Sequence, residues 1–497
     1  MNILLIRPPL GIADRNAITK REIFLPPVGI SYIASFLKQH GFQSVKIVDF
    51  CAESLAYIER YFTGVNADLI GISCLTGQHL ESFRIAQLAK TRIQTNPLVV
   101  LGGPHVSAEG LDIQIMENTP HIDFIVRGEG EVTMLELVKA LATKSSYERI
   151  EGLTFRKDSN GSQQVFRNPD RQPISNLDIV PFPDYSRDDF SGKNNAFDGH
   201  HYIKPQSGQT QGFRYAPLIS SRGCPYDCQF CSRFWGTNVR MRSPENIFAE
   251  MMFFYENLKI SHFTFLDDCF NVSIPRIKTL CRYIIEKKLP FTWTAVGRAN
   301  FITEDLLQDM KRAGCVGIDF GVESGDPGIL NTINKKISVD TIEKAFALTR
   351  KYGLRSKALL MVGNPGETRK SIANTIALMK RTLPDTIDVA PIKIFPNSHL
   401  HKLALTQGAI SQDYWLKNPT APYYTVEYTA DRLRYFRLKV LLGYHKAKKN
   451  FPMVLKLLIL ISGVRCVIAS GRSIDSIRDS LLKIPLIGSL LKKLKTV

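Results

Sequence analysis

The sequence predicts an α/β protein with two sheets. A doubly wound sheet of the flavodoxin or Rossmann type comes first, then a partial (βα)6 barrel built like a TIM barrel, then a helical tail. Three observations predict it. Apolar β-branched runs alternate with amphipathic runs over residues 1–145. The alternation restarts at residue 215 and continues through six units. Between and after these stretches the alternation stops.

The first domain is expected over residues 1–145. Its five strands are apolar runs, each followed by a helical pattern, near residues 2–9, 44–50, 68–76, 98–105 and 123–131. Near-continuous apolar strands that alternate with helices indicate a parallel sheet covered on both faces. The ligand of such a sheet binds beyond the carboxyl ends of its strands.

Small residues at these strand ends are candidate cofactor-binding positions. They are Gly102, Gly103, Pro104 and His105 after the fourth strand, and Gly128, Glu129 and Gly130 after the fifth. Glycine there lets the backbone approach a large flat or phosphate-bearing ligand. Ordinary tight turns explain the same residues equally well. The glycines do not follow G-x-G-x-x-G, so a nicotinamide cofactor has no support.

Residues 146–214 are expected to be a linker that contains a hairpin around Asn160-Gly161. The partial barrel is expected over residues 215–430. Polar motifs end most of its strands, where such barrels place their chemistry. These motifs are Cys224–Cys231, Asp267-Asp268, Arg298, Glu323-Ser324 and Asn364–Thr368.

The tail, residues 431–497, holds most of the positive charge. From Arg432 to Val497 there are 15 Lys/Arg and 2 Asp/Glu, which is +13 of the chain's net +18. The rest of the chain, residues 1–431, is therefore only weakly basic, and a nucleic-acid groove is not expected there. Lys456 and Arg465 interrupt the apolar run, which argues against a spanning helix. The tail is expected either to lie on a membrane surface or to pack as helices on the barrel.

The N-terminus predicts a strand and not a signal peptide, so we expect a cytoplasmic protein, with the membrane surface as its peripheral alternative. In a reducing compartment, clustered cysteines favour metal over disulfides. Cys224, Cys228 and Cys231 lie within eight positions, and no second pair completes a zinc site. Three thiolates from one loop suit an iron–sulfur cube whose fourth iron stays open to a small molecule.

The stretch "RGCPYDCQFC" resembles the C-x3-C-x2-C signature of radical SAM enzymes, including Phe230 before the last cysteine. The resemblance covers residues 215–400. It implies a [4Fe–4S] cluster on the three cysteines, with S-adenosylmethionine on the fourth iron and cleavage to a 5′-deoxyadenosyl radical. It also implies cofactor contacts from Asp267, Asp268, Glu323 and Ser324, and from the Asn364–Thr368 loop. For each of these taken alone, a cap or turn role is an equal alternative.

The stretches "LPPVGISYIASFLKQHGF", "LGGPH" and "GEGE" resemble the cobalamin-binding domain of one radical SAM subclass. The resemblance implies that cobalamin is a third cofactor. The D-x-H-x-x-G motif that gives cobalt a histidine is missing, because "RPPLGIADRN" follows the first strand. His105 is a candidate ligand, with a structural turn histidine as the alternative.

These resemblances imply a methyltransferase that acts on an unactivated carbon. Alternatives are an oxidative cyclase of the tetrapyrrole type and a non-catalytic iron–sulfur sensor or electron carrier. A methylthiotransferase lacks support because its three further N-terminal cysteines are missing. Expected partners are a small-molecule or lipid-like substrate and a reduced flavodoxin or ferredoxin. Cys269 is expected to be a buried thiol, with a catalytic role as the alternative.

Overall fold

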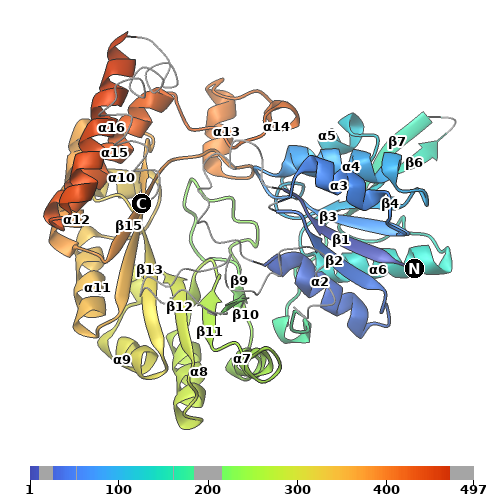
Figure 1. Ribbon diagram of the computed structural model, residues 1–497, viewed down its shortest axis with the longest axis horizontal. Coiled ribbons are helices and arrows are strands. Elements are labelled where there is room, and N and C mark those ends of the chain that lie inside the picture. The colour runs from blue at the N-terminus through green and yellow to red at the C-terminus, as the bar shows by residue number, and fades with distance from the viewer. Residues whose placement is uncertain (10–25, 52, 160–161, 184–214, 471–497) are drawn as a thin grey trace.

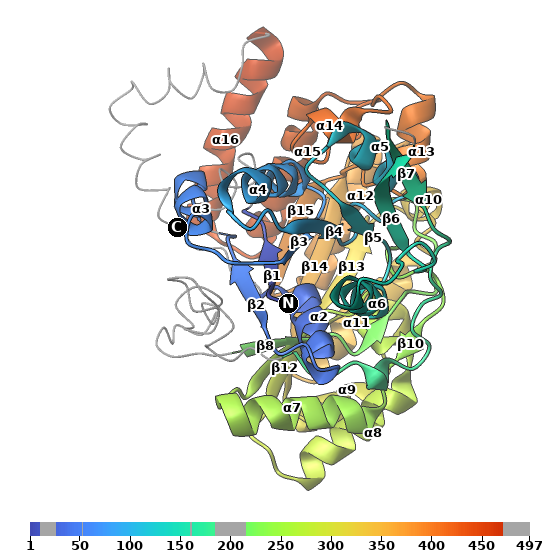
Figure 2. The same cartoon turned by 90° about the vertical axis from the view of Figure 1, so that its right-hand side faces the viewer.

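The computed structural model describes residues 1–9, 26–51, 53–159, 162–183 and 215–470. Two α/β parts lie side by side, the N-terminal one in blue and the second in green to orange (Figure 1). Each part is built on its own sheet, and the helices of residues 430–470 lie on the outer side of the second part (Figures 1 and 2). The two predicted α/β regions are therefore confirmed.

The N-terminal sheet has the order β2-β1-β3-β4-β5-β6-β7. Its strands are β1 (Ile3–Arg7), β2 (Val45–Asp49), β3 (Leu69–Ser73), β4 (Leu98–Gly102), β5 (Phe124–Val126), β6 (Leu153–Ser159) and β7 (Ser162–Arg167). The first five are parallel, in the flavodoxin-like order 2-1-3-4-5. The hairpin expected in a linker instead adds antiparallel β6 and β7 to this sheet. Its turn, Asn160-Gly161, lies outside the described residues.

Helices cover both faces of this sheet, as expected for a doubly wound fold. They are α2 (Val28–Gln39), α3 (Leu55–Phe62), α4 (His79–Arg92), α5 (Leu111–Asn118) and α6 (Gly130–Thr143). α2 and α6 pack together on the face whose core is continuous with that of the second part. α3, α4 and α5 cover the opposite face and enclose a separate apolar core. Both faces are buried, which accounts for the near-continuous apolar strands.

The second sheet has the order β15-β14-β13-β12-β11-β8, and every neighbouring pair is parallel. Its strands are β8 (Tyr215–Leu218), β11 (His262–Phe265), β12 (Thr292–Gly297), β13 (Cys315–Glu323), β14 (Arg355–Val362) and β15 (Thr386–Pro391). β8 and β15 are edges that do not pair with each other. Six strands therefore form an open, partial barrel, as predicted.

Helices follow the barrel strands in the predicted places. They are α7 (Pro244–Leu258), α8 (Ile274–Glu286), α9 (Glu304–Arg312), α11 (Val339–Lys351) and α12 (Arg369–Thr382), with a short α10 (Pro327–Thr332) after β13. Side-chain oxygens of Ser243, Thr303, Ser338 and Thr368 accept from the first turns of α7, α9, α11 and α12. These caps satisfy amide groups that would lack partners, and so fix where each helix begins.

The segment after β15 leaves the barrel. It contains α13 (His399–Thr406) and α14 (Tyr414–Lys417), which bridge towards the N-terminal part (Figure 1). Trp415 is 1% exposed in the apolar core of the N-terminal sheet, and His79 Nε2 lies 2.7 Å from the Asn418 carbonyl oxygen. The sequence assigned this segment to the barrel. Apolar periodicity predicts that a helix is buried but not which surface covers it.

The tail forms two antiparallel helices, α15 (Ala430–Ala447) and α16 (Phe451–Ser470). α15 packs against α12 and β15, which confirms helical packing on the barrel. α16 packs against α15 and stands at the outer edge of the molecule (Figures 1 and 2). Within the described residues, no helix is both long and apolar enough to span a membrane.

A buried ion network joins the two parts. Glu129 and Glu131 begin α6, and Arg222 and Arg240 lie on the paired short strands β9 (Ser221–Arg222) and β10 (Arg240–Met241). Arg222 lies 2.5 Å from Glu131 and 3.3 Å from Glu129, and Arg240 lies 2.5 Å from Glu129. None of the four side chains is more than 8% exposed. Both carboxylates also lie at the positive N-terminal end of a helix.

We predict that Glu129→Gln destabilises the protein by about 3 kcal/mol, because two buried guanidinium groups then share one carboxylate. Chemical denaturation monitored by circular dichroism measures the change. The matched control is Glu343→Gln, since Glu343 pairs with Arg381 at 2.7 Å on the surface. We expect the control to change the free energy of unfolding by less than about 1 kcal/mol. Equal effects of the two variants would contradict the prediction.

Candidate functional site

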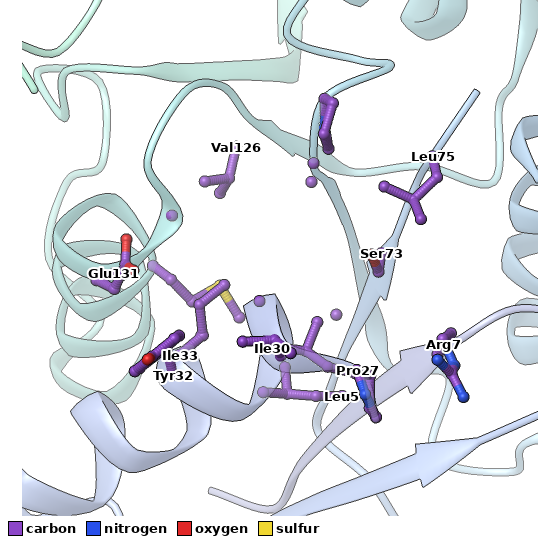
Figure 3. Close-up of a pocket in the computed structure, with 18 of the residues that line it drawn as sticks. Leu5, Arg7, Pro27, Ile30, Tyr32, Ile33, Ser73, Leu75, Val126 and Glu131 are labelled. Atoms are coloured by element: carbon purple, nitrogen blue, oxygen red, sulfur yellow. The ribbon is translucent and has the colours of Figure 1, made fainter. Parts of the chain in front are cut away.

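A cavity of about 370 Å³ lies at the carboxyl ends of β1, β3, β4 and β5, between the two parts. Its wall is mainly apolar, with Leu5, Ile30, Ile33 and Val126 among the lining residues (Figure 3). α2 supplies one side of the wall, including the aromatic ring of Tyr32 (Figure 3). The cavity therefore lies where a doubly wound sheet binds its ligand.

Residues of the barrel part complete this cavity. Phe234 and Trp235 line it, and they follow Cys231 by three and four positions. The Arg222 guanidinium lies over the Trp235 ring, 4.7 Å from its centroid. The ion network thus also fixes an aromatic side chain that reaches the cavity from the cysteine loop.

The candidate cofactor-binding residues at the ends of β4 and β5 do not all reach the cavity. Those that line it are Gly102, Gly103, Pro104, Gly128 and Gly130. Because four of these five are glycines, a ligand can approach the backbone closely. Glu129 does not line it, and its carboxylate instead faces Arg222 and Arg240. The Glu129 carboxylate therefore joins the two parts through these arginines, and its contact with a cofactor stays a prediction.

His105 is also directed away from the cavity. Its Nδ1 lies 3.0 Å from Thr76 Oγ1, and its ring stacks on His79 with centroids 4.3 Å apart. Trp415 packs edge-on at 5.5 Å. Burial, and then the neighbouring His79, lower the pKa of His105 well below its usual value. These contacts favour the structural alternative for His105, a packing element beneath α14, and its role as a cobalt ligand stays a prediction.

The cysteine loop is held from three directions. Cys224 N donates to Gly236 O at 3.2 Å, and Gln229 N donates to Ile333 O at 3.1 Å. Asn334 Nδ2 donates to the Asp227 carbonyl at 2.7 Å. Gly223 precedes the loop with φ +95°, and a side chain there would meet the Asn238 carbonyl oxygen at 2.5 Å. The loop conformation therefore depends on glycine at this position.

The three loop cysteines differ in exposure, with Cys224 half-buried, Cys228 buried and Cys231 exposed. A hydrogen bond from the buried Cys269 thiol lowers the pKa of Cys224 to about 6. No group of His, Cys, Asp or Glu in the described part of the chain converges on a single metal ion. A cube of four irons does not need such convergence, because each cysteine binds a different iron.

Asp267 and Asp268 follow β11 but have different surroundings. Ser220 Oγ and Ser221 Oγ donate to Asp267 at 3.0 and 2.6 Å, and burial raises the pKa of its carboxyl group. Asp267 therefore fixes the start of the cysteine loop, and its contact with a methionine amine stays a prediction. Asp268 stays exposed, accepts from the Gly223 amide and has a pKa raised by desolvation and by Asp267.

Glu323 is a strained residue at the end of β13. Its φ is +65°, and the strand register shifts between Gly321 and Glu323. Lys335 Nζ donates to Glu323 Oε1 at 2.8 Å, with both side chains buried. A side chain at Gly321 would meet Glu323 Oε1 at 2.8 Å and Lys335 Nζ at 2.9 Å. Glycine therefore makes room for this ion pair, and the strain marks a candidate functional position.

Ser324 and Phe230 complete the predicted set. Ser324 is fully buried against α12, where its Oγ lies 3.3 Å from Thr375 Oγ1. Its hydroxyl group therefore has a protein partner, and its contact with the cofactor stays a prediction. Phe230 is half-buried in an apolar cluster with Ile392, and its ring centroid lies 5.8 Å from Lys335 Nζ. Phe230 packs the cysteine loop against the segment that follows β15.

The loop after β14 holds unpaired polar atoms. Asn364 is fully buried, and Oε1 of the buried Glu367 has no partner among the described residues. Burial raises the pKa of Glu367 to about 7, although the Gly363 amide opposes the shift. Buried groups without partners in a loop at a strand end indicate a place for a polar ligand.

Comparison with known proteins identifies both parts. The model of the radical SAM superfamily matches residues 218–379, and that of the B12 binding domain matches residues 15–138. An "uncharacterized methyltransferase" of Pyrococcus horikoshii is 30% identical over 458 residues, covering 89% of this chain and 94% of that protein. The chain belongs to the radical SAM superfamily. It is a member that carries a B12-binding domain.

Two further proteins are similar to this chain. The anaerobic magnesium-protoporphyrin IX monomethyl ester cyclase of Rubrivivax gelatinosus is 26% identical to this chain. The match covers 76% of this chain and 65% of the cyclase. The structure of the cobalamin-dependent S-adenosylmethionine radical enzyme OxsB, with aqua-cobalamin and S-adenosylmethionine bound, has a TM-score of 0.68. It is 16% identical and covers 97% of this chain and 75% of that chain, so it shows a shared fold.

The described residues fit the three cofactors of this family. The apolar, glycine-lined cavity fits the flat ring of cobalamin. The cysteine loop offers three thiols, and one of them, Cys228 Sγ, lies 3.8 Å from Nη1 of the buried Arg298. The Nε of Arg298 has no partner among the described atoms. Glu323 and Lys335 carry the opposite charges needed to bind the amino and carboxylate groups of S-adenosylmethionine.

Sequence reasoning missed several of these residues. Lys335 lies in a turn after α10 and Trp235 in an irregular loop, so neither shows a periodic pattern. Arg222 directly precedes the "GC" of the cysteine motif, but nothing local pairs it with a glutamate 91 positions away. The available signal was the pair of glutamates at the start of α6, because buried acids require cationic partners.

We predict that Cys224→Ala, Cys228→Ala and Cys231→Ala each lose the broad visible absorbance of the reconstituted cluster and all turnover. Each variant removes one of three thiolate ligands. Iron and sulfide analysis with visible spectroscopy measures this. Cys281→Ala is the control, since Cys281 is fully buried in α8 on the outer side of the barrel. A full cluster in any of the three loop variants would contradict the prediction for that residue.

Proposed function

We propose that this chain is a cobalamin-dependent radical SAM methyltransferase that acts on an unactivated carbon of a small molecule. When bound, the cluster with S-adenosylmethionine supplies a radical that removes a hydrogen atom, and cobalamin supplies the methyl group. Among this chain's own residues, the proposed ligands of the cluster are Cys224, Cys228 and Cys231.

One observation carries the proposal. The loop that holds the three cysteines continues directly into Phe234 and Trp235, which line the cavity of the B12-binding domain. A single rigid segment therefore contacts both cofactor sites. Methyl transfer to a substrate radical requires the two reactive centres to face one substrate atom, and a shared loop supports that geometry.

The surrounding residues bind, orient and exclude water. Glu323 and Lys335 are proposed to hold the charged end of S-adenosylmethionine, and they pair with each other without it. Gly102, Gly103, Gly128 and Gly130 are proposed to let the corrin ring approach the sheet edge. The apolar cavity wall keeps water from a reactive radical. His105 is buried away from this wall, so no imidazole from the described residues reaches it.

An oxidative cyclase is the second candidate, because the Rubrivivax cyclase is 26% identical over 76% of this chain. Its identity to this chain and its coverage are lower than those of the Pyrococcus relative. A non-catalytic iron–sulfur carrier is less well supported, since a carrier needs neither the Glu323–Lys335 pair nor a second cofactor cavity.

The test is turnover of the anaerobically reconstituted protein with S-adenosylmethionine, methylcobalamin, a reductant and an extract of candidate substrates. We predict both 5′-deoxyadenosine and S-adenosylhomocysteine, measured by mass spectrometry. 5′-Deoxyadenosine without S-adenosylhomocysteine or a methylated product would favour the cyclase. Absence of both, with a full cluster, would contradict the enzyme assignment.

A reduced flavodoxin or ferredoxin is the proposed electron donor. Cys231 is the exposed member of the triplet, so the cluster edge beside it is the accessible entry for an electron. Arg233 follows Cys231 by two positions and pairs with Asp227 at 2.5 Å.

The outer face of α16 supports a lipid-like substrate and contact with an anionic membrane. Phe451, Leu455 and Leu458 form one stripe and are 73%, 55% and 42% exposed. Lys446, Lys448 and Lys449 are exposed at the adjoining corner with α15. Residues 432–470 contain no Asp or Glu. An apolar stripe flanked by lysines matches the headgroup region of an anionic bilayer in both polarity and charge.

We predict that Phe451→Ser, Leu455→Ser and Leu458→Ser together weaken binding to phosphatidylcholine vesicles containing phosphatidylglycerol by about tenfold or more. Sedimentation with vesicles measures this, with circular dichroism to check folding. The control is Ile179→Ser, since Ile179 is an exposed apolar residue on a distant segment, 51% accessible. If the triple variant and the wild type pelleted equally with the vesicles, the proposed contact with a membrane would be contradicted.

A further inference from the structure

Arg298 is a buried cation beside the cysteine loop that the proposed function does not use. It follows β12 and is 6% exposed. Its backbone is fixed on both sides by the buried Asn271. Arg298 N donates to Asn271 Oδ1 at 2.9 Å, and Asn271 Nδ2 donates to the Arg298 carbonyl at 2.8 Å. The side chain therefore leaves the strand end from a fixed position.

The guanidinium is fixed by three groups. Its Cζ lies 3.5 Å from the centroid of the Tyr226 ring, and its Nη2 donates to the Lys335 carbonyl. Its Nη1 donates to Cys228 Sγ at 3.8 Å. Two of these contacts, Tyr226 and Cys228, belong to the cysteine loop itself. The positive charge is thus held against one of the three proposed ligand sulfurs.

The consequence is electrostatic. A guanidinium stays charged at all accessible pH values. Reduction adds one negative charge to an iron–sulfur cluster, so a fixed cation and a hydrogen bond to a ligand sulfur stabilise the reduced form more than the oxidised form. Burial weakens solvent screening of this interaction. Among the described residues, the partners of the Arg298 guanidinium are a thiol, a carbonyl and an aromatic ring, so no direct ion pair cancels its charge.

We propose that Arg298 raises the reduction potential of the cluster on Cys224, Cys228 and Cys231. The inference rests on the proposed function, because it presumes that the cluster is there. A one-electron donor is oxidised and the cluster is reduced by that electron, with no bond made or broken in the protein. Arg298 is a positioning residue, since it acts on the reacting groups through Cys228.

Three variants separate charge from shape. Arg298→Gln keeps a donor group but removes the charge. Arg298→Lys keeps the charge but loses the planar fork that lies on Tyr226 and reaches Lys335. The matched control is Lys336→Gln. It also removes one positive charge, but the Lys336 side chain is exposed and its charge is screened by solvent.

The experiment is a redox titration of each anaerobically reconstituted protein, with the reduced cluster measured by electron paramagnetic resonance. Iron and sulfide content is measured first. We expect the midpoint potential of Arg298→Gln to be more negative than that of the wild type, with Arg298→Lys between them. We expect Lys336→Gln to match the wild type. This order of potentials would support the proposal.

Other outcomes overturn it. A wild-type potential in Arg298→Gln with a full cluster would exclude the effect of the charge. Loss of the cluster from both Arg298 variants would assign the residue to cluster retention and overturn its role in setting the potential. A wild-type protein that takes up no cluster would instead overturn the proposed function, and this inference with it. Measuring cluster content before potential distinguishes the two failures.

Discussion

The ion network around Arg222 is the interaction on which the rest of the molecule depends. Arg222 binds Glu131 and Glu129 of the B12-binding domain, stacks on Trp235, and precedes Cys224 by two residues. One side chain thereby fixes the joint between the domains, the cavity wall and the start of the cysteine loop. Buried ion pairs tolerate little displacement, because each charge has lost its water. The two proposed cofactor sites therefore keep one separation and orientation.

Around this joint, side chains divide between binding and support. Asp267, Ser324, Glu129 and His105 are polar residues at strand ends, yet each is engaged by neighbouring protein groups. The residues proposed to meet ligands are glycines, thiols and the Glu323–Lys335 pair. A radical site needs this division, since rigid support keeps reactive atoms aligned and a closed apolar wall excludes water.

Much of the fold could be predicted because it is written in local patterns. The eleven parallel strands of the two sheets correspond to apolar runs, and the Ser and Thr caps mark where barrel helices begin. The hairpin was also recognisable from its turn residues, but the sequence did not show that it pairs with the first sheet. Nor did the sequence show that the segment around Trp415 packs against the N-terminal part. Pairing partners and covering surfaces depend on contacts between distant parts of the chain, which periodicity does not encode.

The sequence by itself determined the chemistry class, because the spacing of Cys224, Cys228 and Cys231 limits which metal centre one loop can hold. It also determined the order of the domains. Only the tertiary structure decided which polar residues face a ligand. In the folded chain, His105 packs beneath α14, and Asp267 accepts hydrogen bonds from two serines. Lys335 pairs with Glu323, and Arg298 donates to Cys228. The physical reason is that a buried charge or hydrogen-bonding group is assigned by whichever partner packing brings within reach.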